Sequence, residues 1–395
     1  MNILIINSGS SSIKYQLLEM PSSRVICVGS IERIGSTDAI SNYRTDNNKV
    51  EKIYEIANHK AGLERITSLL LDAEIGVLKS TEEIDAIGHR VVHGGSDYTA
   101  TTLVTEEVKE KIKILSPLAP LHNPANLEGI LMAEQIFAIA KQMVVFDTAF
   151  HGTMPVKAKK YAVPNELYEK DGVQAYGFHG TSHKYVSEKA NEYLNNQHTK
   201  LISIHLGNGC SITAIQDGKS IDHSMGFAPS NGIVMGTRSG DIDHSIIFYM
   251  VNTLGYDLNE VSELLNKKSG MLGLTGFNDL RDIEEEASKG NKQCILALEM
   301  NAYRIKKYIG AYTSAMNGLD AIIFTAGIGE NSSLMRQLIC KDMEYFDLNL
   351  DDSKNDLRAS NLRELNTEDS KVKILVIPTN EELEIAKQVY QLLSK

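Results

Sequence analysis

Asn2–Glu19 reads N-I-L-I-I-N-S-G-S-S-S-I-K-Y-Q-L-L-E, and Leu201–Lys219 reads L-I-S-I-H-L-G-N-G-C-S-I-T-A-I-Q-D-G-K. Each stretch is an apolar run, then a turn rich in glycine, serine or asparagine, then a second run typical of a strand. We interpret the repeat as the start of two copies of one domain, with two glycine-rich hairpins facing a shared cleft. The alternative is a chance likeness between two hairpins of a common kind.

Between and beyond these hairpins, short apolar runs alternate with amphipathic patterns, which predicts α/β layers. Buried strands are predicted at Asn2–Ile6, Ala86–Val92, Met143–Phe146, Leu201–His205, Ala321–Phe324 and Ile374–Ile377. Helical spacing marks Leu63–Leu71, Glu106–Leu115, Ala125–Ala140, Ser182–Leu194, Leu258–Leu265, Ile283–Met316 and Glu381–Leu393. The region from Ile283 is one broken helix or two, and the polar stretch Asp351–Lys373 is expected to be irregular at its start.

The composition excludes several classes of protein. The chain has 395 residues, 42% of them hydrophobic and 23% charged, which is typical of a globular protein of two domains. The net charge of -11 argues against nucleic-acid binding, and no apolar run approaches the roughly 20 residues of a membrane span. The start reads as a strand and not as a signal peptide. The four cysteines are far apart in the sequence, which predicts reduced thiols and a cytoplasmic protein.

The turn Asn7–Lys14, N-S-G-S-S-S-I-K, follows the first predicted strand. Its backbone N–H groups and hydroxyls suit phosphate oxygens, and Lys14 adds a positive charge. It lacks the G-x-x-x-x-G-K pattern and no helix is expected after it, so it is not a Walker A loop. A plain hairpin turn explains the glycine and serines but explains the lysine less well.

Two arginines lie where an anion would be bound. Gly226–His244, G-F-A-P-S-N-G-I-V-M-G-T-R-S-G-D-I-D-H, is too irregular for a helix or strand, and its glycines surround Arg238. Such a guanidinium can grip an anion through two parallel hydrogen bonds. Arg90, in Gly88–Gly95, lies at the end of a buried run. It either pairs with a carboxylate side chain or binds an anionic ligand.

Acidic and imidazole side chains follow further strands. Asp147 in Val145–His151 could orient a nucleophile, accept a proton, hold a hydrated metal, or only cap a turn. Tyr176–His183, Y-G-F-H-G-T-S-H, has two histidines four residues apart, as in some zinc sites. The glycine between them favours a loop that leads into a helix. We therefore interpret His179 as a hydrogen-bond donor to developing charge.

Three other segments suit a nucleotide and its metal. His205–Gly209 and Gly327–Asn331 are glycine-rich turns after strands, where a backbone can approach a nucleotide closely. Pro378–Glu382 opens the last predicted helix, and its Glu381 could bind magnesium directly or through water. The alternative for Glu381 is the ordinary preference of acidic residues for a helix N-terminus.

Together these motifs resemble the acetate kinase family, within the acetate and sugar kinase/Hsp70/actin superfamily. The matching text includes G-H-R-V-V-H-G-G, H-N-P-A-N, F-D-T-A-F-H, G-T-R-S-G-D-I-D and A-G-I-G-E-N, in family order over nearly the whole chain. The resemblance implies two duplicated RNase H-like (actin-like ATPase) domains around a central cleft. They would comprise residues 1–148, joined by the C-terminal helix 382–395, and residues 149–381, which would carry most of the nucleotide site.

The resemblance also implies an activity. A family member is a phosphotransferase with a carboxyl acceptor, a homodimer that reversibly makes acetyl phosphate and ADP from acetate and ATP with Mg²⁺ (or Mn²⁺). The first alternative is a kinase for propionate or another short-chain acid. The second is an ATP-driven clamp of the actin/Hsp70 type, which is disfavoured because a clamp needs no carboxylate site. Acetate and ATP, and not a nucleic acid or a membrane, are thus the expected partners.

The resemblance assigns roles to individual residues. The implied catalytic residues are Arg90, His122, Asp147, His179 and Arg238. The implied acetate site consists of Arg90, Val92, Leu121, Phe178 and Pro229. The implied nucleotide contacts are Ser10, Ser12, Lys14, His205, Leu206, Gly207, Asn208, Gly209, Asp279, Leu280, Arg281, Gly327, Ile328, Gly329, Glu330 and Asn331. The implied metal ligands are Asn7 and Glu381.

The sequence departs from the family pattern at three places. Ser230-Asn231 stands where the family usually has Leu-Glu, and His244 stands where it usually has proline. The stretch Thr275–Arg281 is one residue shorter than usual. The first two departures are expected to alter loop rigidity or a dimer contact, and the third bears on the nucleotide contacts of Asp279 and Arg281.

Overall fold

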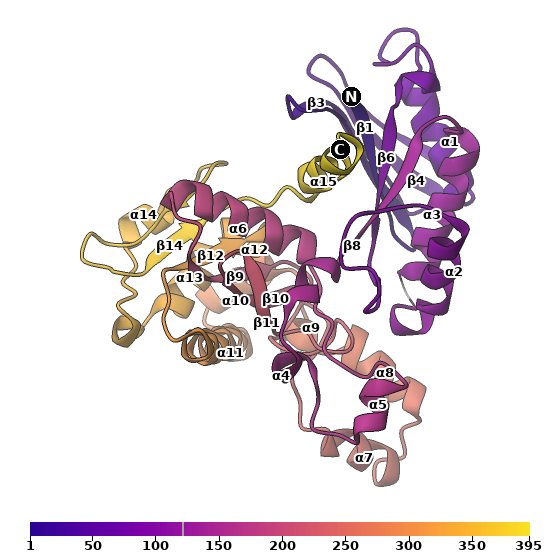
Figure 1. The fold of residues 1–395 in the computed structure, drawn as a ribbon. Helices are drawn as coiled ribbons and strands as arrows, with labels where there is room; N and C mark the ends of the chain where they lie inside the picture. The colour runs from indigo at the N-terminus through magenta and orange to yellow at the C-terminus, as the bar shows by residue number, and fades with distance from the viewer. Residues whose placement is uncertain (121) are drawn as a thin grey trace. The chain divides into compact units, whose positions relative to one another are not determined.

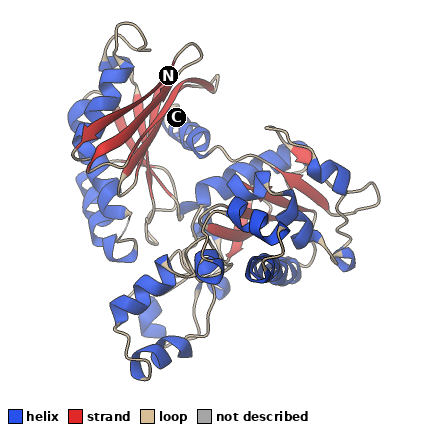
Figure 2. Ribbon diagram, turned by 180° about the vertical axis from the view of Figure 1, so that it is seen from behind, coloured by secondary structure: helices blue, strands red, loops and turns tan. Residues whose placement is uncertain are grey.

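The computed structural model describes residues 1–120 and 122–395 of the chain. The chain divides into two compact units, Met1–Phe150 with Asn380–Lys395, and His151–Thr379 (Figure 1). Helices flank the strands in each unit (Figure 2), as the α/β pattern of the sequence predicts. Within the described ranges, no helix is both long enough and apolar enough to cross a membrane.

The first unit is built on the strand order β5-β4-β3-β2-β1-β6-β8-β7 in its described part. Its strands are β1 Asn2–Ser8, β2 Ser12–Glu19, β3 Arg24–Glu32, β4 Ser36–Arg44, β5 Lys49–Ile56, β6 Ala86–Val91, β7 Thr102–Leu103 and β8 Lys141–Phe146. Its helices are α1 His59–Leu70, α2 Glu106–Ile114, α3 Asn123–Ile136 and, from the end of the chain, α15 Glu381–Leu393.

The second unit has the strand order β11-β10-β9-β12-β14-β13. Its strands are β9 Lys200–Leu206, β10 Cys210–Gln216, β11 Lys219–His223, β12 Ala321–Thr325, β13 Arg363–Glu364 and β14 Lys373–Val376. Its helices are α4 Val156–Lys159, α5 Asn165–Glu169, α6 Gly180–Leu194, α7 Ser245–Asn252, α8 Leu258–Lys267, α9 Gly270–Thr275, α10 Leu280–Ser288, α11 Lys292–Met316, α12 Ala326–Asn331, α13 Ser333–Cys340 and α14 Asp352–Asp356.

The two sheets share one topology. The order β3-β2-β1-β6-β8 in the first corresponds to β11-β10-β9-β12-β14 in the second. Within each set of five strands, three form an antiparallel meander and the remaining two pairs are parallel. The two hairpins that the repeat predicts are β1-β2 and β9-β10. The internal repeat and the α/β fold class are therefore confirmed.

Strand β1 is buried on both faces, which explains its nearly continuous apolar sequence. Leu4 and Ile6 belong to the core formed with α1 and α3. Ile3 and Ile5 belong to a second core, which α15 completes with Ile385, Ala386 and Val389. Burying one such aliphatic side chain contributes roughly 1.5–3 kcal/mol. This burial holds the last helix of the chain, and with it Glu381, on the first unit.

Gly88 of β6 is required by the close approach of α15. A Cβ atom at this position would lie 2.7 Å from Ile385 Cγ2 and 2.9 Å from Ile5 Cδ1. Contacts this short would force the helix away from the sheet. The glycine therefore sets the distance between α15 and β6, two residues before Arg90.

The predicted helical region Ile283–Met316 is two helices. Helix α10 ends at Ser288 and α11 begins at Lys292. Gly290 between them has a φ of +90°, in the left-handed region that favours glycine, and the Asn291 side chain accepts hydrogen bonds from the first N–H groups of α11. The break thus follows from a glycine and an N-cap residue that are adjacent in the sequence.

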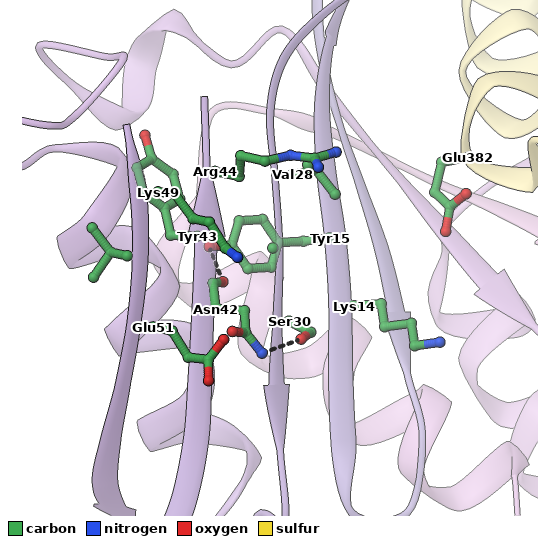
Figure 3. A pocket seen from close by; sticks show the side chains of 12 residues that line it. Lys14, Tyr15, Val28, Ser30, Asn42, Tyr43, Arg44, Lys49, Glu51 and Glu382 are labelled. Atoms are coloured by element: carbon green, nitrogen blue, oxygen red, sulfur yellow. Dashed lines mark hydrogen bonds between the residues drawn. The ribbon is translucent and has the colours of Figure 1, made fainter. Parts of the chain in front are cut away.

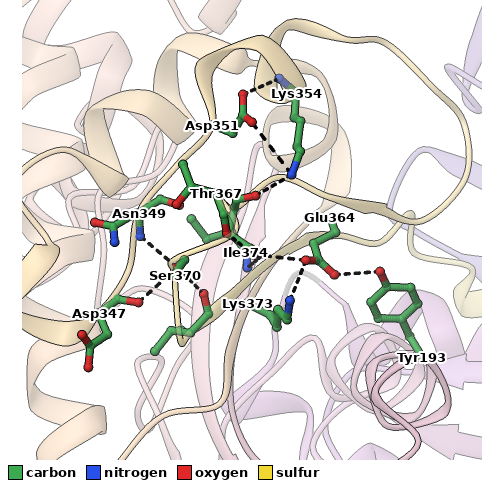
Figure 4. A network of polar contacts seen from close by, with 12 residues as sticks. Tyr193, Asp347, Asn349, Asp351, Lys354, Glu364, Thr367, Ser370, Lys373 and Ile374 are labelled. Carbon is green, nitrogen blue, oxygen red and sulfur yellow. Dashed lines mark hydrogen bonds and ion pairs between the residues drawn. The ribbon is translucent and has the colours of Figure 1, made fainter.

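The polar stretch Asp351–Lys373 is organised by side chains more than by backbone pairing (Figure 4). Glu364 accepts a hydrogen bond from Tyr193 Oη at 2.7 Å and pairs with Lys373 Nζ at 2.7 Å. Lys354 Nζ donates to the Asn366 carbonyl at 2.7 Å. These contacts fix the short strand β13 at the edge of the second sheet.

Candidate functional site

A cluster of charged side chains, buried at Asp147 and half-buried at Arg90 and Glu381, lies at one end of the first sheet. Strands β6 and β8 are parallel neighbours, so their carboxyl ends meet at the same edge. Arg90 is near the end of β6 and Asp147 directly follows β8. Arg90 Nη2 lies 2.7 Å from Asp147 Oδ2, and Arg90 Nε lies 3.6 Å from Glu381 Oε2 at the start of α15. The structure thus brings together three residues that are far apart in the sequence.

Burial and the charge of neighbouring groups have opposite effects on the pKa values of Arg90 and Glu381. Burial alone would lower the pKa of Arg90, but the charges of Asp147 and Glu381 outweigh it and raise that pKa. Burial raises the pKa of Glu381 to about 7, although the positive charge of Arg90 opposes the rise. Glu381 is therefore poised near neutral pH, where a bound cation would favour its ionised form.

The turn between β1 and β2 carries the predicted phosphate contacts. Asn7 and Lys14 are cross-strand partners, and the Gly9 N–H donates to the Ser12 carbonyl at 2.8 Å. Ser10 and Lys14 are exposed. Lys14 also lines a cavity of about 410 Å³ on the open face of β2–β5 (Figure 3). The ammonium group of Lys14 is therefore accessible to a ligand.

Two other predicted residues of this unit lie near the end of β6 or the start of α3. His122 immediately precedes α3, and its carbonyl accepts a hydrogen bond from the Asn126 N–H at 2.9 Å. Val92 is buried, and its N–H donates to Asn126 Oδ1 at 3.1 Å. Asn126 thus ties His122 and Val92 to one helix. Leu121 lies outside the described residues.

In the second unit, His179 and Arg238 converge on the turn after β9. A Cβ atom placed on Gly209 would lie 3.2 Å from Arg238 Nη2 and 3.3 Å from His179 Nε2. Gly209 therefore leaves room for both side chains. His179 has a φ of 55°, in the left-handed region that a histidine rarely adopts, and it immediately precedes α6. Backbone strain from a left-handed φ in a residue other than glycine is concentrated at functional sites.

A chain of hydrogen bonds lies behind His179. Its Nδ1 is 2.9 Å from Ser211 Oγ, which is 2.7 Å from His183 Nε2. His183 Nδ1 is in turn 2.8 Å from Ser203 Oγ. Burial lowers the pKa of His183 well below its usual value, so this ring is neutral. The chain orients the His179 ring, which also stacks on His205 with ring centroids 4.2 Å apart.

Phe178 and Pro229 are predicted to contact a methyl group. Phe178 directly precedes His179 in the sequence, and Pro229 lies shortly before Arg238. Phe178 is buried, and its N–H donates to His223 Nε2 at 3.0 Å. The Pro229 carbonyl accepts a hydrogen bond from Arg238 Nη1. Pro229 therefore also holds the guanidinium in place.

A cavity of about 630 Å³ lies in the second unit. It is large enough for a nucleoside and within the usual range for small-ligand sites. Eight predicted nucleotide contacts line it: Gly207, Asn208, Asp279, Leu280, Arg281, Gly327, Ile328 and Asn331. The structure adds lining residues that the sequence analysis missed: Cys210, Val234, Met235, Gly236, Met271, Asn278, Ile283, Glu284, Asn301, Ser332 and Arg358.

Four other predicted nucleotide contacts of this unit, His205, Leu206, Gly329 and Glu330, are not among the residues that line this cavity. His205 Nδ1 is 2.9 Å from Ser182 Oγ, and Leu206 is buried in the core. Gly329 and Glu330 belong to α12, whose carbonyls accept hydrogen bonds from the buried guanidinium of Arg336 at 2.9 and 3.1 Å. Arg336 belongs to no recognisable motif, so only the structure shows that it fixes α12.

The three departures from the family pattern lie at loops and helix ends. Ser230 and Asn231 precede Gly232, whose N–H donates to Asp241 Oδ1 at 2.8 Å. His244 is the N-cap residue of α7. In the shortened stretch, the Asp279 side chain caps α10 and pairs with Arg281 at 2.5 Å. The shortened stretch still leaves Asp279 and Arg281 in the lining of the cavity.

Comparisons with known proteins agree with this geometry. A sequence model of the Acetokinase family matches residues 2–387. The acetate kinase of Flavobacterium johnsoniae is 65% identical over 393 residues, which cover 100% of both chains. The crystal structure of Porphyromonas gingivalis acetate kinase has a TM-score of 0.94 at 43% identity, covering 99% of each chain. A propionate kinase structure from Francisella tularensis has a TM-score of 0.92 at 43% identity, covering 98% of each chain. The chain therefore belongs to the acetokinase family.

Proposed function

We propose that this protein is an acetate kinase, which reversibly transfers the γ-phosphoryl group of ATP to acetate and gives acetyl phosphate and ADP. The observation that carries the proposal is the meeting of Arg238 and His179 at Gly209, two residues from the cavity lining at Gly207. A cation and an imidazole beside a cavity of nucleoside size suit transfer of a terminal phosphoryl group. The 65% identity to an acetate kinase supports acetate as the acceptor.

The acetate carboxylate is already ionised, so its attack on phosphorus needs no strong base. The barrier lies in bringing two anions together in line. We assign Arg90 and Arg238 to the carboxylate and the transferring phosphoryl group, and His179 to charge that develops in the transition state. Asp147 orients the acetate and the Arg90 guanidinium, and His122 supports the site.

The remaining assignments concern substrate binding. Val92, Leu121, Phe178 and Pro229 would surround the acetate methyl group, and Lys14 with Ser10 and Ser12 would contact the phosphates. The predicted domain of residues 149–381 would hold the base and ribose in its cavity of about 630 Å³, which the predicted contacts Gly207, Asn208, Asp279, Arg281 and Ile328 line. The unit of Met1–Phe150 with Asn380–Lys395 would supply Arg90, Asp147 and Glu381, so the second segment of the first domain begins slightly before the predicted residue 382.

The residues present fit a magnesium ion. Asn7 and Glu381 carry oxygen donors, which Mg²⁺ prefers as ligands. The β1–β6 register pairs Ile6 with His89, so Asn7 comes next to Arg90 along neighbouring strands. Burial raises the pKa of Glu381, and a divalent cation at its carboxylate would offset that effect. Bound Mg²⁺ would neutralise charge on the phosphates.

The direct test is an acyl phosphate assay with purified protein and Mg-ATP, in which hydroxylamine traps the product. Acetate should give the highest kcat/KM. Propionate should give a value lower by about 10- to 200-fold, the usual effect of one methylene, and butyrate, with two, a value lower still. A preference for propionate would keep the mechanism and change the substrate. ATP hydrolysis without acyl phosphate from any acid would contradict the proposal.

We also propose a homodimer. The segment from Ile242 through α7 to Leu258 exposes a run of large apolar side chains: Ile242, Ile246, Phe248, Tyr249, Leu254, Tyr256 and Leu258. An apolar surface of this kind marks a protein interface. Sedimentation velocity should give twice the 43.6 kDa mass of one chain, and Phe248→Arg should shift it toward the monomer. A monomer at micromolar concentration would rule out this assembly.

We place the enzyme in the cytoplasm. Cys27, Cys210, Cys294 and Cys340 are all free and buried, which suits a reducing compartment. Cell fractionation would test the assignment, and recovery of the protein outside the cytoplasm would contradict it.

A further inference from the structure

Two serine hydroxyls and one imidazole connect to His179 in a row of hydrogen bonds. Ser203, His183 and Ser211, which form this row, are all 0% exposed. Ser203 Oγ lies 2.8 Å from His183 Nδ1 and has no second hydrogen-bond partner within residues 1–120 and 122–395. Because the row ends at a hydroxyl with one partner, the direction of each hydrogen bond in it can be derived.

The hydroxyl of Ser203 must be the donor at this end. If it accepted a hydrogen bond from His183 Nδ1, its own hydrogen would be buried without an acceptor, which is costly and rare in native structures. Ser203 therefore donates to His183 Nδ1. Burial lowers the pKa of His183 well below its usual value, so the ring is neutral and carries one hydrogen. That hydrogen lies on Nε2, since Nδ1 accepts.

The next two hydrogen bonds follow from the state of His183. Its Nε2 lies 2.7 Å from Ser211 Oγ and donates to that oxygen. The other partner of Ser211 Oγ in the described part of the chain is His179 Nδ1, at 2.9 Å, so the Ser211 hydrogen points to that nitrogen. His179 Nδ1 is then an acceptor, and the hydrogen of the neutral ring lies on Nε2.

The Nε2 atom of His179 faces the turn after β9. A Cβ atom on Gly209 would lie 3.3 Å from this nitrogen and 3.2 Å from Arg238 Nη2, so the two groups border the same space. An N–H group on Nε2 would donate to an anionic oxygen beside the guanidinium. The other tautomer would present a lone pair there and repel that oxygen.

We propose that Ser211 is a positioning residue, which donates to His179 Nδ1 and thereby holds the proton of that ring on Nε2, toward the transferring phosphoryl group. His183 and Ser203 set the direction of this donation. The inference rests on the proposed function, because it takes His179 as a donor to the phosphoryl group. It deepens that function by naming the residues that fix the proton. Ser211 lies within strand β10, outside every motif of the sequence.

Imidazole nitrogen chemical shifts show directly which ring nitrogen carries a proton. The test uses the whole protein without substrates at neutral pH, with histidine labelled on both ring nitrogens. The resonances of His179 are assigned by their loss in His179→Gln. In the wild-type protein, His179 should show an unprotonated Nδ1 and a protonated Nε2. A proton on Nδ1, whether or not Nε2 also carries one, would overturn the inference, and this measurement needs no variant at Ser211.

Ser211→Ala removes the donor to His179 Nδ1. The ring is then free to exchange between its tautomers, so the Nδ1 resonance of His179 should move toward that of Nε2. In the hydroxylamine assay kcat should fall about tenfold, the effect of one hydrogen bond, with KM for acetate and ATP nearly unchanged. Ser211→Thr keeps the hydroxyl and should restore the wild-type resonance and most of kcat.

Ser220→Ala is the matched control. Ser220 is also 0% exposed, and its Oγ lies 2.9 Å from Nδ1 of another buried histidine, His151. This variant should keep the wild-type kcat and the wild-type resonances of His179. An unchanged Nδ1 resonance in folded Ser211→Ala would overturn the inference, as would an equal loss of kcat in Ser220→Ala. If no acetyl phosphate formed while the resonances behaved as expected, the proposed function would fail and the position of the proton would stand.

Discussion

Arg238→Ala should lower kcat by about 10²–10³, because it removes the preorganised cation that we assign to the transferring phosphoryl group. Within the described residues, Arg238 has no ion pair with a carboxylate, and the Pro229 carbonyl holds its Nη1. Burial lowers the pKa of Arg238, in agreement with the lack of a carboxylate partner among the described residues. An anionic substrate would provide that partner.

The same features predict a small effect on folding. Removal of a half-buried cation that has no carboxylate partner should leave the melting temperature nearly unchanged or raise it. Arg238→Lys should recover only part of the turnover, because an ammonium group cannot make the two parallel hydrogen bonds of a guanidinium. The measurements are kcat and KM for acetate in the hydroxylamine assay, with thermal melting of each variant. Turnover of Arg238→Ala within tenfold of wild type would contradict the assignment.

Much of the fold could be predicted because its central strands are buried on both faces. Strands such as β1 and β12 are therefore continuous apolar runs in the sequence. Strands β3, β4 and β5 were not predicted. Their burial is partial, and β5 reads K-V-E-K-I-Y-E-I with most side chains exposed. At the edge of a sheet, backbone pairing sustains a strand that its side chains do not reveal.

The candidate site likewise contains residues whose positions the sequence predicts and residues whose positions it does not. Arg90, Asp147 and His205 lie at the ends of buried strands, so their positions could be read from the sequence. Asn301 lies in the middle of a 25-residue helix, where an asparagine has no local signature. Only the packing of α11 beside Met271 places it in the lining of the cavity. Residues that act through tertiary packing thus stay invisible until the fold is known.

Arg90→Ala should affect both catalysis and stability. It removes the cation between Asp147, at 2.7 Å, and Glu381, at 3.6 Å. Turnover should fall by about 10²–10³, since one of the groups that we assign to binding the two anions is lost. The Asp147 carboxylate, 1% exposed, would lose its arginine, and breaking a buried pair in this way destabilises a protein by about 3–5 kcal/mol.

The stability loss should depend on pH in a defined direction. The pKa of Glu381 in the folded protein is already raised to about 7 from 4.5, mainly by burial, while Arg90 opposes the rise. Without Arg90 the pKa of Glu381 rises further. A carboxyl group whose folded pKa exceeds its unfolded value binds its proton more tightly when folded, so stability is lost as pH rises through that interval. The deficit of Arg90→Ala should therefore widen between pH 5.5 and 8.5.

Thermal melting of wild type and Arg90→Ala at several pH values, without magnesium or nucleotide, measures this deficit directly. Arg90→Lys is the matched control, because it keeps the positive charge but not the guanidinium geometry. It should restore most of the stability at high pH while turnover stays low. If the Arg90→Ala deficit were constant or smaller at high pH, Arg90 would not be the group that keeps Glu381 ionised. A lysine variant with full turnover would mean that charge alone, and not a two-pronged grip on the substrate, is what the site requires at this position.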